Sequence, residues 1–260
     1  MSLATNSRFS RYLVNDQVGV GSTGKVYRCH DPLKGRDVAL KILFPENGVQ
    51  DDQTVAQFIE EALIMKSLVH DSIPEFYESG NENGVHYIVS EFLEGKPLCG
   101  PMSVSELMII AEQIGAGIIA MHEAGVVHRD IKPKNLIMTS AGRVKIIDFG
   151  RASRLTPVMA ADPEQLAQWQ WLVRAEQLTL GMVLYELATG RGPFRDRETS
   201  RTLSGLLGEQ LVTLTSEGKS VLLDALKKCA AKDGSNSWLL LVAMSLAFSL
   251  AGPPGSAGEI

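Results

Sequence analysis

The stretch that decides the fold is His128-Arg129-Asp130-Ile131-Lys132-Pro133-Lys134-Asn135, followed by Asp148-Phe149-Gly150 after the apolar run VKII. Asp130 can accept a proton from a hydroxyl group and orient its oxygen for attack. Asn135 and Asp148 offer hard oxygen ligands that suit Mg²⁺, and Lys132 can neutralise negative charge that develops beside them. Any one motif could arise by chance, since surface Asp and Asn are common. Their combined order and spacing leave little room for chance.

A second motif is GVGSTGKV at 19–26. Its glycines let the backbone turn sharply and approach phosphate oxygens, to which amide N–H groups can donate. The pattern GxGxxG alone is weak, because a flexible hairpin or a dinucleotide-binding fold can also contain it. The dinucleotide fold requires a helix after the loop, whereas the strand-like VYRC and then Val38-Ala39-Leu40-Lys41 follow here.

These motifs together resemble the protein kinases, and most of all the bacterial serine/threonine protein kinases. The phrases GRDVALKIL and MHEAGVVHRDIKPKN carry the resemblance, which runs from about Tyr12 to about Phe194. Lys132 is typical of the serine/threonine branch. The resemblance implies an α+β, two-lobed protein-kinase-like fold, with a small antiparallel β-sheet and one helix in the N-lobe and a mainly helical C-lobe.

The expected organisation is a kinase domain at 12–237, with an N-lobe at about 12–93 and a C-lobe at about 94–237, followed by an apolar C-terminal segment at 238–260. A turn is expected at Lys34-Gly35, and short strands around Leu136 and at 144–147. The capping box of Ser103 and Glu106 predicts the start of a long helix. Further helices are expected around 178–189 and 220–231. A helix in TVAQFIEEALIMKSLV is indicated by apolar residues at helical spacing, namely Phe58, Ala62, Met65 and Val69.

The resemblance also implies roles for individual residues. Lys41 would bind the α- and β-phosphates of ATP while paired with Glu61 on the following helix, for which Glu60 is the alternative. The implied catalytic residues are Asp130, Lys132, Lys41 and Glu61, and the implied metal ligands are Asn135 and Asp148. The implied ATP-binding residues are Val18, Gly19, Gly21, Gly24, Val26, Ala39, Lys41, Glu91, Leu93 and Ile137.

Within that ATP site, residues 91–93 would be the hinge that holds adenine by backbone hydrogen bonds. Val26, Ala39 and Ile137 would sandwich the ring. Ser90 falls where a side chain closes the back of the adenine pocket, and serine is small for that position. It can equally be an ordinary strand residue, and the sequence does not rank the two interpretations.

Several departures from the kinase pattern fall between Gly150 and the middle of the C-lobe. Only RASRLTPVMAAD, at 151–162, precedes Pro163, which is a short activation segment. Thr156 matches a threonine that contacts the catalytic Asp and Lys in kinases. Asp162 replaces the usual Ala, and Glu176 replaces an Asp that supports the catalytic loop. Glu164 lacks its usual arginine partner near the end of the chain, so it is either exposed or paired with Arg174.

The expected function is an ATP-dependent protein serine/threonine kinase that transfers the γ-phosphoryl group of Mg·ATP to a Ser or Thr hydroxyl of a protein substrate. ATP and Mg²⁺ are the expected cofactors. The short activation segment keeps two alternatives open, a nucleotide-binding pseudokinase or scaffold and a small-molecule kinase. Activity is expected not to depend on phosphorylation of the activation segment, whose hydroxyl residues are Ser153 and Thr156.

The composition limits which binding partners and which cellular compartment are expected. The net charge is −5 and no long basic block occurs, which argues against nucleic-acid binding. Three widely spaced cysteines and an N-terminus without an apolar signal indicate the cytoplasm. The apolar run at 238–251 is shorter than the ~20 residues of a membrane span, so a buried helix is favoured. Lys227, Lys228 and Lys232 would suit the alternative, a C-terminal membrane anchor.

Overall fold

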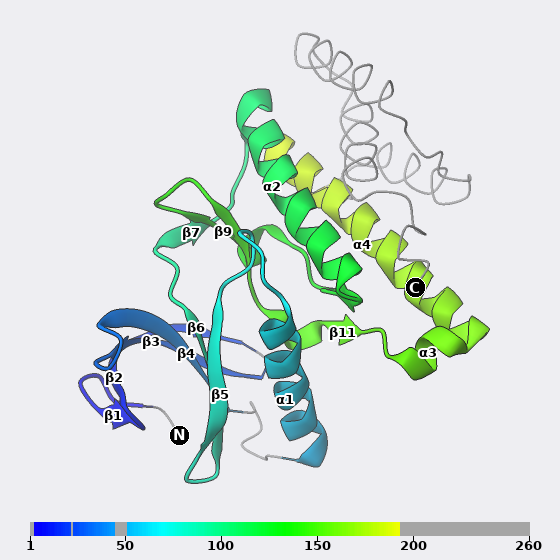
Figure 1. The fold of residues 1–260 in the computed structure, drawn as a ribbon. Coiled ribbons are helices and arrows are strands. Elements are labelled where there is room, and N and C mark those ends of the chain that lie inside the picture. The colour runs from blue at the N-terminus through cyan, green and yellow to red at the C-terminus, as the bar shows by residue number, and fades with distance from the viewer. Residues whose placement is uncertain (1–2, 22, 45–50, 193–260) are drawn as a thin grey trace.

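The computed structural model describes residues 3–21, 23–44 and 51–192, and an antiparallel sheet dominates its N-terminal part. The strand order is β1-β2-β3-β4-β6-β5 (Figure 1). Gly35, with φ +61°, lies in the predicted turn between β3 and β4, which is confirmed. The strands are β1 (Arg8–Phe9), β2 (Tyr12–Val20), β3 (Gly24–Asp31), β4 (Arg36–Leu43), β5 (Phe76–Glu82) and β6 (Val85–Glu91).

Lys41 lies in an interior strand of this sheet. It is opposite Val26 of β3 on one side and opposite Ile88 of β6 on the other. Its neighbours in β4, Leu40 and Ile42, are buried. Because side chains alternate along a strand, those two face the apolar core while Lys41 projects from the other face of the sheet.

Helix α1 (Asp52–Ser67) begins at the N-cap Asp51, whose side chain accepts a hydrogen bond from the Thr54 amide. Phe58, Ala62 and Met65 are buried, as their helical spacing predicts. The prediction was wrong for Val69, which is 96% exposed. The helix ends at Ser67 and its C-cap Leu68 is extended, so Val69 lies beyond the last turn and leaves the buried face.

The C-terminal part is built around two long helices, α2 (Val104–Glu123) and α4 (Pro163–Thr189), which pack side by side (Figure 1). The capping box that begins α2 is confirmed, because the Ser103 amide donates to Glu106 and the Glu106 amide donates to Ser103 Oγ. The shorter elements are β7 (Gly95–Pro97), β8 (Val126–Val127), η1 (Pro133–Asn135), β9 (Leu136–Thr139), β10 (Val144–Ile146), η2 (Phe149–Arg151), β11 (Ser153–Arg154) and α3 (Pro157–Ala161).

Helix α4 is longer than the predicted helix at 178–189. It begins at Pro163, and the N-cap is Asp162, whose carboxylate accepts hydrogen bonds from the amides of Glu164 and Gln165. Asp is a strong N-cap residue and Pro suits the first helical position. Asp162, a departure from the kinase pattern, therefore has a structural explanation, since it starts one unbroken helix.

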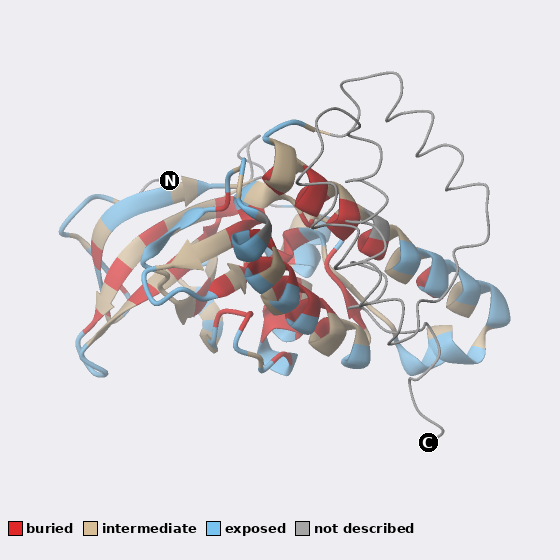
Figure 2. Cartoon of the chain, turned by 90° about the horizontal axis from the view of Figure 1, so that it is seen from above, coloured by how far each residue is buried: buried red, intermediate tan, exposed pale blue. Residues whose placement is uncertain are grey.

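The hydrophobic core joins the two parts of the chain. One cluster contains residues of α1, such as Phe58 and Ile64, together with Ile114 and Ile118 of α2 and Leu184 of α4. In Figure 2 the buried segments, drawn in red, gather where the sheet meets the helices. A second cluster packs inside the N-terminal sheet. The predicted α+β, two-lobed architecture is confirmed.

The predictions for the end of the chain, which are the helix at 220–231, the C-lobe boundary at 237 and the apolar segment at 238–260, lie outside the described residues. Within the part of the chain that the structure describes, no helix combines the length and hydropathy needed to cross a membrane.

Candidate active site

A cavity of about 530 Å³ opens where the N-terminal sheet meets the loops of the C-terminal part. All of the predicted ATP-binding residues line this cavity except Gly24. Gly24 begins β3, and a Cβ atom there would lie 2.1 Å from the carbonyl oxygen of Ile42. A Cβ at Gly19 or Gly21 would meet nothing closer than 3.7 Å. Gly24 therefore allows β3 and β4 to approach, whereas a Cβ at either of the other two glycines would make only ordinary van der Waals contacts.

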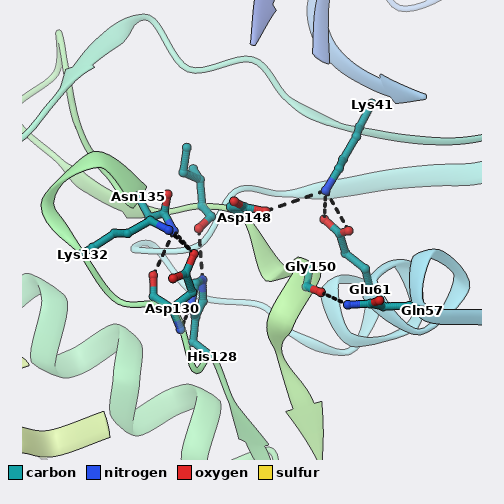
Figure 3. A network of polar contacts seen from close by, with 10 residues as sticks. Lys41, Gln57, Glu61, His128, Asp130, Lys132, Asn135, Asp148 and Gly150 are labelled. Carbon is teal, nitrogen blue, oxygen red and sulfur yellow. Dashed lines mark hydrogen bonds and ion pairs between the residues drawn. The ribbon is translucent and has the colours of Figure 1, made fainter. Parts of the chain in front are cut away.

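The back of the cavity holds an ion pair between the sheet and α1. Lys41 Nζ lies 2.7 and 2.8 Å from the two carboxylate oxygens of Glu61, and 3.8 Å from Asp148 Oδ1 (Figure 3). Lys41 therefore pairs with Glu61 and not with the alternative Glu60. Only 3% of Glu61 is exposed, and burial raises the pKa of its carboxyl group while the charge of Lys41 lowers it.

The loop after β8 brings Asp130, Lys132 and Asn135 together. Asn135 Nδ2 donates to the Asp130 carbonyl at 2.9 Å and to Asp130 Oδ2 at 3.0 Å, and Lys132 Nζ also donates to Oδ2 (Figure 3). Burial raises the pKa of Asp130, but the bonds from Lys132 and Asn135 and the charge of Arg151 outweigh burial and lower it. Asp130 is therefore ionised at neutral pH and can accept a proton.

Asn135 and Asp148 both line the cavity. Because the amide nitrogen of Asn135 is used by Asp130, its amide oxygen is the atom left to bind a cation. Mg²⁺ is usually held by one or two protein side chains, with phosphate and water oxygens completing its shell. The donor set that these two residues offer fits that ion.

His128 holds the loop that carries Asp130 in place through contacts of its imidazole ring. Its Nδ1 accepts a hydrogen bond from the Asp130 amide at 3.3 Å, its Nε2 donates to the Ile147 carbonyl at 3.0 Å, and its ring meets Phe149 edge-on. Burial is the main cause that lowers the pKa of His128 below its ordinary value of 6.5. The neutral imidazole, with one donor and one acceptor, matches both partners.

We expect the free energy of unfolding to fall as the pH drops below about 6.5, because only the unfolded chain then protonates this histidine freely. The limiting slope for one group is about 1.4 kcal/mol per pH unit. His128→Gln keeps a donor and an acceptor without titrating. Urea unfolding between pH 5 and 7 should therefore show a shallower pH dependence in His128→Gln, and equal slopes in the two proteins would contradict the expectation.

Glu176 of α4 supports the same loop. Its Oε1 accepts a hydrogen bond from the Arg129 amide at 2.7 Å, and its Oε2 lies 2.8 Å from His122 Nε2. Arg129 has φ +65°, a backbone conformation that non-glycine residues adopt only at a cost. The longer Glu side chain therefore reaches the catalytic loop and holds it in this conformation.

Lys145 supports the cavity although no sequence motif indicates a role for it. Its Nζ donates to Glu91 Oε2 at 2.7 Å and to the Ile73 carbonyl at 3.1 Å, and Glu91 also accepts a hydrogen bond from the Glu75 amide. These bonds fix the start of the predicted hinge against β10. In the sequence, Lys145 is a lone lysine between apolar strand residues, which gives no indication of a partner.

Thr156 does not take the position that the kinase resemblance implies. Its side chain caps α3 by accepting a hydrogen bond from the Met159 amide, and it is exposed. Among the described residues it makes no hydrogen bond to Asp130 or Lys132, so that expectation was wrong here. The helix that starts directly after Thr156 takes its hydroxyl oxygen instead. Glu164 is exposed, which is one of the two alternatives considered for it and removes the need for a buried partner.

Comparison with known proteins agrees with this geometry. Residues 12–236 match the family model described as "Protein kinase domain". The chain is 35% identical over 202 residues to serine/threonine-protein kinase PrkC of Bacillus subtilis, covering 71% of this chain and 31% of that relative. It is 30% identical over 251 residues to the probable serine/threonine-protein kinase PknB of Lactococcus lactis, covering 88% and 40%.

A third relative, serine/threonine-protein kinase PknL of Mycobacterium tuberculosis (strain H37Rv), is 32% identical over 203 residues, covering 71% of this chain and 51% of the relative. The matched region thus spans between about a third and a half of these curated relatives. The family model covers most of the chain. The chain therefore belongs to the protein kinase family.

Proposed function

We propose that this chain is an ATP-dependent protein serine/threonine kinase that uses Mg²⁺. The observation that carries the proposal is the formed Lys41–Glu61 ion pair, with Asp148 beside it. A kinase requires this pair and the metal-binding Asp in place at the same time. Here they lie in one site with an ionised Asp130.

Each residue has a role in this proposal. Lys41 binds the α- and β-phosphates, and Glu61 holds Lys41 in place. The oxygens of Asn135 and Asp148 would hold Mg²⁺, which would supply positive charge to neutralise the phosphates. Asp130 orients the acceptor hydroxyl and takes its proton, and Lys132, which is hydrogen-bonded to Asp130, would stabilise charge on the transferred group.

We also propose the extent and setting of the domain. The kinase domain spans 12–237, and 238–260 is an apolar C-terminal segment that forms either a buried helix, the favoured alternative, or a membrane anchor. Cys29 and Cys99 are free thiols, which suits the reducing cytoplasm where ATP is available.

The decisive experiment is transfer from labelled ATP by the purified chain, to itself and to a generic basic protein, followed by phosphoamino-acid analysis. We expect labelled Ser or Thr. Absence of transfer would favour the nucleotide-binding pseudokinase, and transfer only to small hydroxyl compounds would favour the small-molecule kinase.

Mg·ATP should raise the melting temperature, because a ligand that binds only the folded state stabilises it by about 2.7 kcal/mol at a hundred times its Kd. Asp148→Asn should reduce the shift in melting temperature with Mg·ATP but change it little with ATP in EDTA, because the variant loses only the part of nucleotide binding that depends on Mg²⁺. The matched control is Asp162→Asn, a change outside the cavity. No shift in the parent protein at millimolar Mg·ATP would contradict nucleotide binding.

A further inference from the structure

Arg154 of β11 makes a link between the activation segment and α1. Its Nη2 atom donates to the Leu63 carbonyl at 2.9 Å and to Ser67 Oγ at 2.7 Å, and Ser67 Oγ in turn donates to the Ile64 carbonyl. These acceptors lie near the C-terminal end of α1. The last carbonyl groups of a helix have no N–H donor within the helix, and this end of the helix dipole carries a partial negative charge. Nη2 of the guanidinium group is therefore bound by this end of the helix, while the buried Nε has no hydrogen-bond partner among the described residues.

A second link lies on the other side of Glu61 in the sequence. Gln57 Nε2 donates to the Gly150 carbonyl at 2.6 Å (Figure 3). The chain that follows Asp148 thus contacts α1 both before and after the residue that pairs with Lys41.

The segment is in turn fixed to the catalytic loop. Strand β11 pairs with β8, with Ser153 opposite Val127 and Arg154 opposite Val126. Strand β8 leads directly into His128 and the loop that carries Asp130. Figure 1 shows β11 beside α1, between that helix and the C-terminal part. A connected set of hydrogen bonds thus runs from the catalytic loop through β11 to α1.

We propose that Arg154 is a positioning residue that holds α1, and through it the Lys41–Glu61 pair, in place without any phosphorylated residue. The proposal rests on the proposed kinase function and concerns the control of the same site. Ser153 supports it, because its Oγ is buried and makes no hydrogen bond among the described residues. A kinase acting on Ser153 would first have to open the β8–β11 pair.

The test compares Arg154→Ala with Arg154→Lys in the full chain, using Arg143→Ala as the control. Arg143 is an exposed arginine of the same lobe that pairs only with the exposed Asp71 among described side chains. We expect Arg154→Ala to lower kcat/KM for ATP about tenfold, because the variant loses the charge-assisted hydrogen bonds that Arg154 makes to α1. Arg154→Lys should recover part of the rate because its ammonium group can reach one acceptor, and Arg143→Ala should match the parent.

A double-mutant cycle separates positioning from general stability. If Arg154 acts through Glu61, Arg154→Ala should cost little further activity in a Glu61→Gln background, because the pair is already lost. Equal losses in both backgrounds would overturn the proposal. Ser67→Ala, which removes one acceptor and leaves Arg154 in place, should give a smaller loss of the same kind if Arg154→Ala proves too unstable to purify.

The same variants also test the proposal without catalysis. If the parent protein transfers no phosphate, the proposed function fails. The affinity for Mg·ADP would still depend on Lys41. That affinity should therefore fall in Arg154→Ala and stay unchanged in Arg143→Ala. Unchanged affinity in Arg154→Ala would overturn the role of Arg154.

In an active parent, phosphatase treatment and Ser153→Ala should leave most of the rate of phosphoryl transfer. A large loss of rate from both phosphatase treatment and Ser153→Ala would show that a phosphate group, and not Arg154 alone, holds α1 and the Lys41–Glu61 pair in place.

Discussion

Replacing Asp130 by Asn is expected to lower the rate of phosphoryl transfer by about 10²–10⁴-fold, the usual contribution of a general base, with little change in Mg·ATP affinity. Asparagine has nearly the same shape and keeps an oxygen for the bond from Lys132. It cannot take the proton of the acceptor hydroxyl. Asp130 is not among the residues that line the cavity, so nucleotide binding should not depend on its charge.

Single-turnover transfer and a thermal shift with Mg·ATP would measure the two properties separately. Asp71→Asn is the matched control, since Asp71 is 80% exposed and lies on the surface. Retained transfer in Asp130→Asn would mean that another group accepts the proton. A lost thermal shift in that variant would mean that Asp130 holds the nucleotide or its metal.

Glu176→Ala is expected to reduce the free energy of unfolding by about 3 kcal/mol, because it removes a buried carboxylate that accepts a hydrogen bond from a backbone amide and pairs with a partly buried histidine. The affected groups are the Arg129 amide and His122, which share the two carboxylate oxygens. Arg129 keeps its left-handed conformation only while the surroundings impose it. Catalytic activity should therefore fall with stability, since Asp130 follows Arg129 directly.

Denaturant unfolding and kcat on the same preparations would test this. Glu164→Ala is the control on the same helix, because Glu164 is exposed and its loss should change stability by no more than about 0.5 kcal/mol. Glu176→Gln should lie between the two, since its amide oxygen still accepts the Arg129 amide. A Glu176→Ala protein as stable as the Glu164→Ala protein would contradict the supporting role.

The sequence predicted those parts of the fold and site that local motifs encode. The short strands around Leu136 and at 144–147, the capping box at Ser103 and the placement of Asp130 and Asn135 in one loop all depend on neighbouring residues. The Lys41–Glu61 pair was accessible only because the resemblance to kinases supplied a partner for an otherwise ordinary lysine. Residue spacing alone would not have distinguished Glu61 from Glu60 as that partner.

The parts that could not be predicted depend on contacts across long stretches of chain. The partners in the Gln57–Gly150 and Arg154–Leu63 bonds are 93 and 91 residues apart, and those in the Lys145–Glu91 bond are 54 apart. Neither periodicity nor composition records such pairs. The errors at Val69 and Thr156 have a different origin, because each lies at the end of a helix, where one residue decides whether a side chain is buried or caps the turn.

The three glycines of the phosphate loop should respond differently to natural selection. At Gly24 any side chain would collide with the Ile42 carbonyl, so a substitution there should be removed in a population that selects only for folded protein. At Gly19 and Gly21 an alanine meets no close atom in the folded chain, and only selection for catalysis should remove it. A lineage that lost its enzymatic role but kept the fold would therefore keep Gly24 while the other two glycines drift.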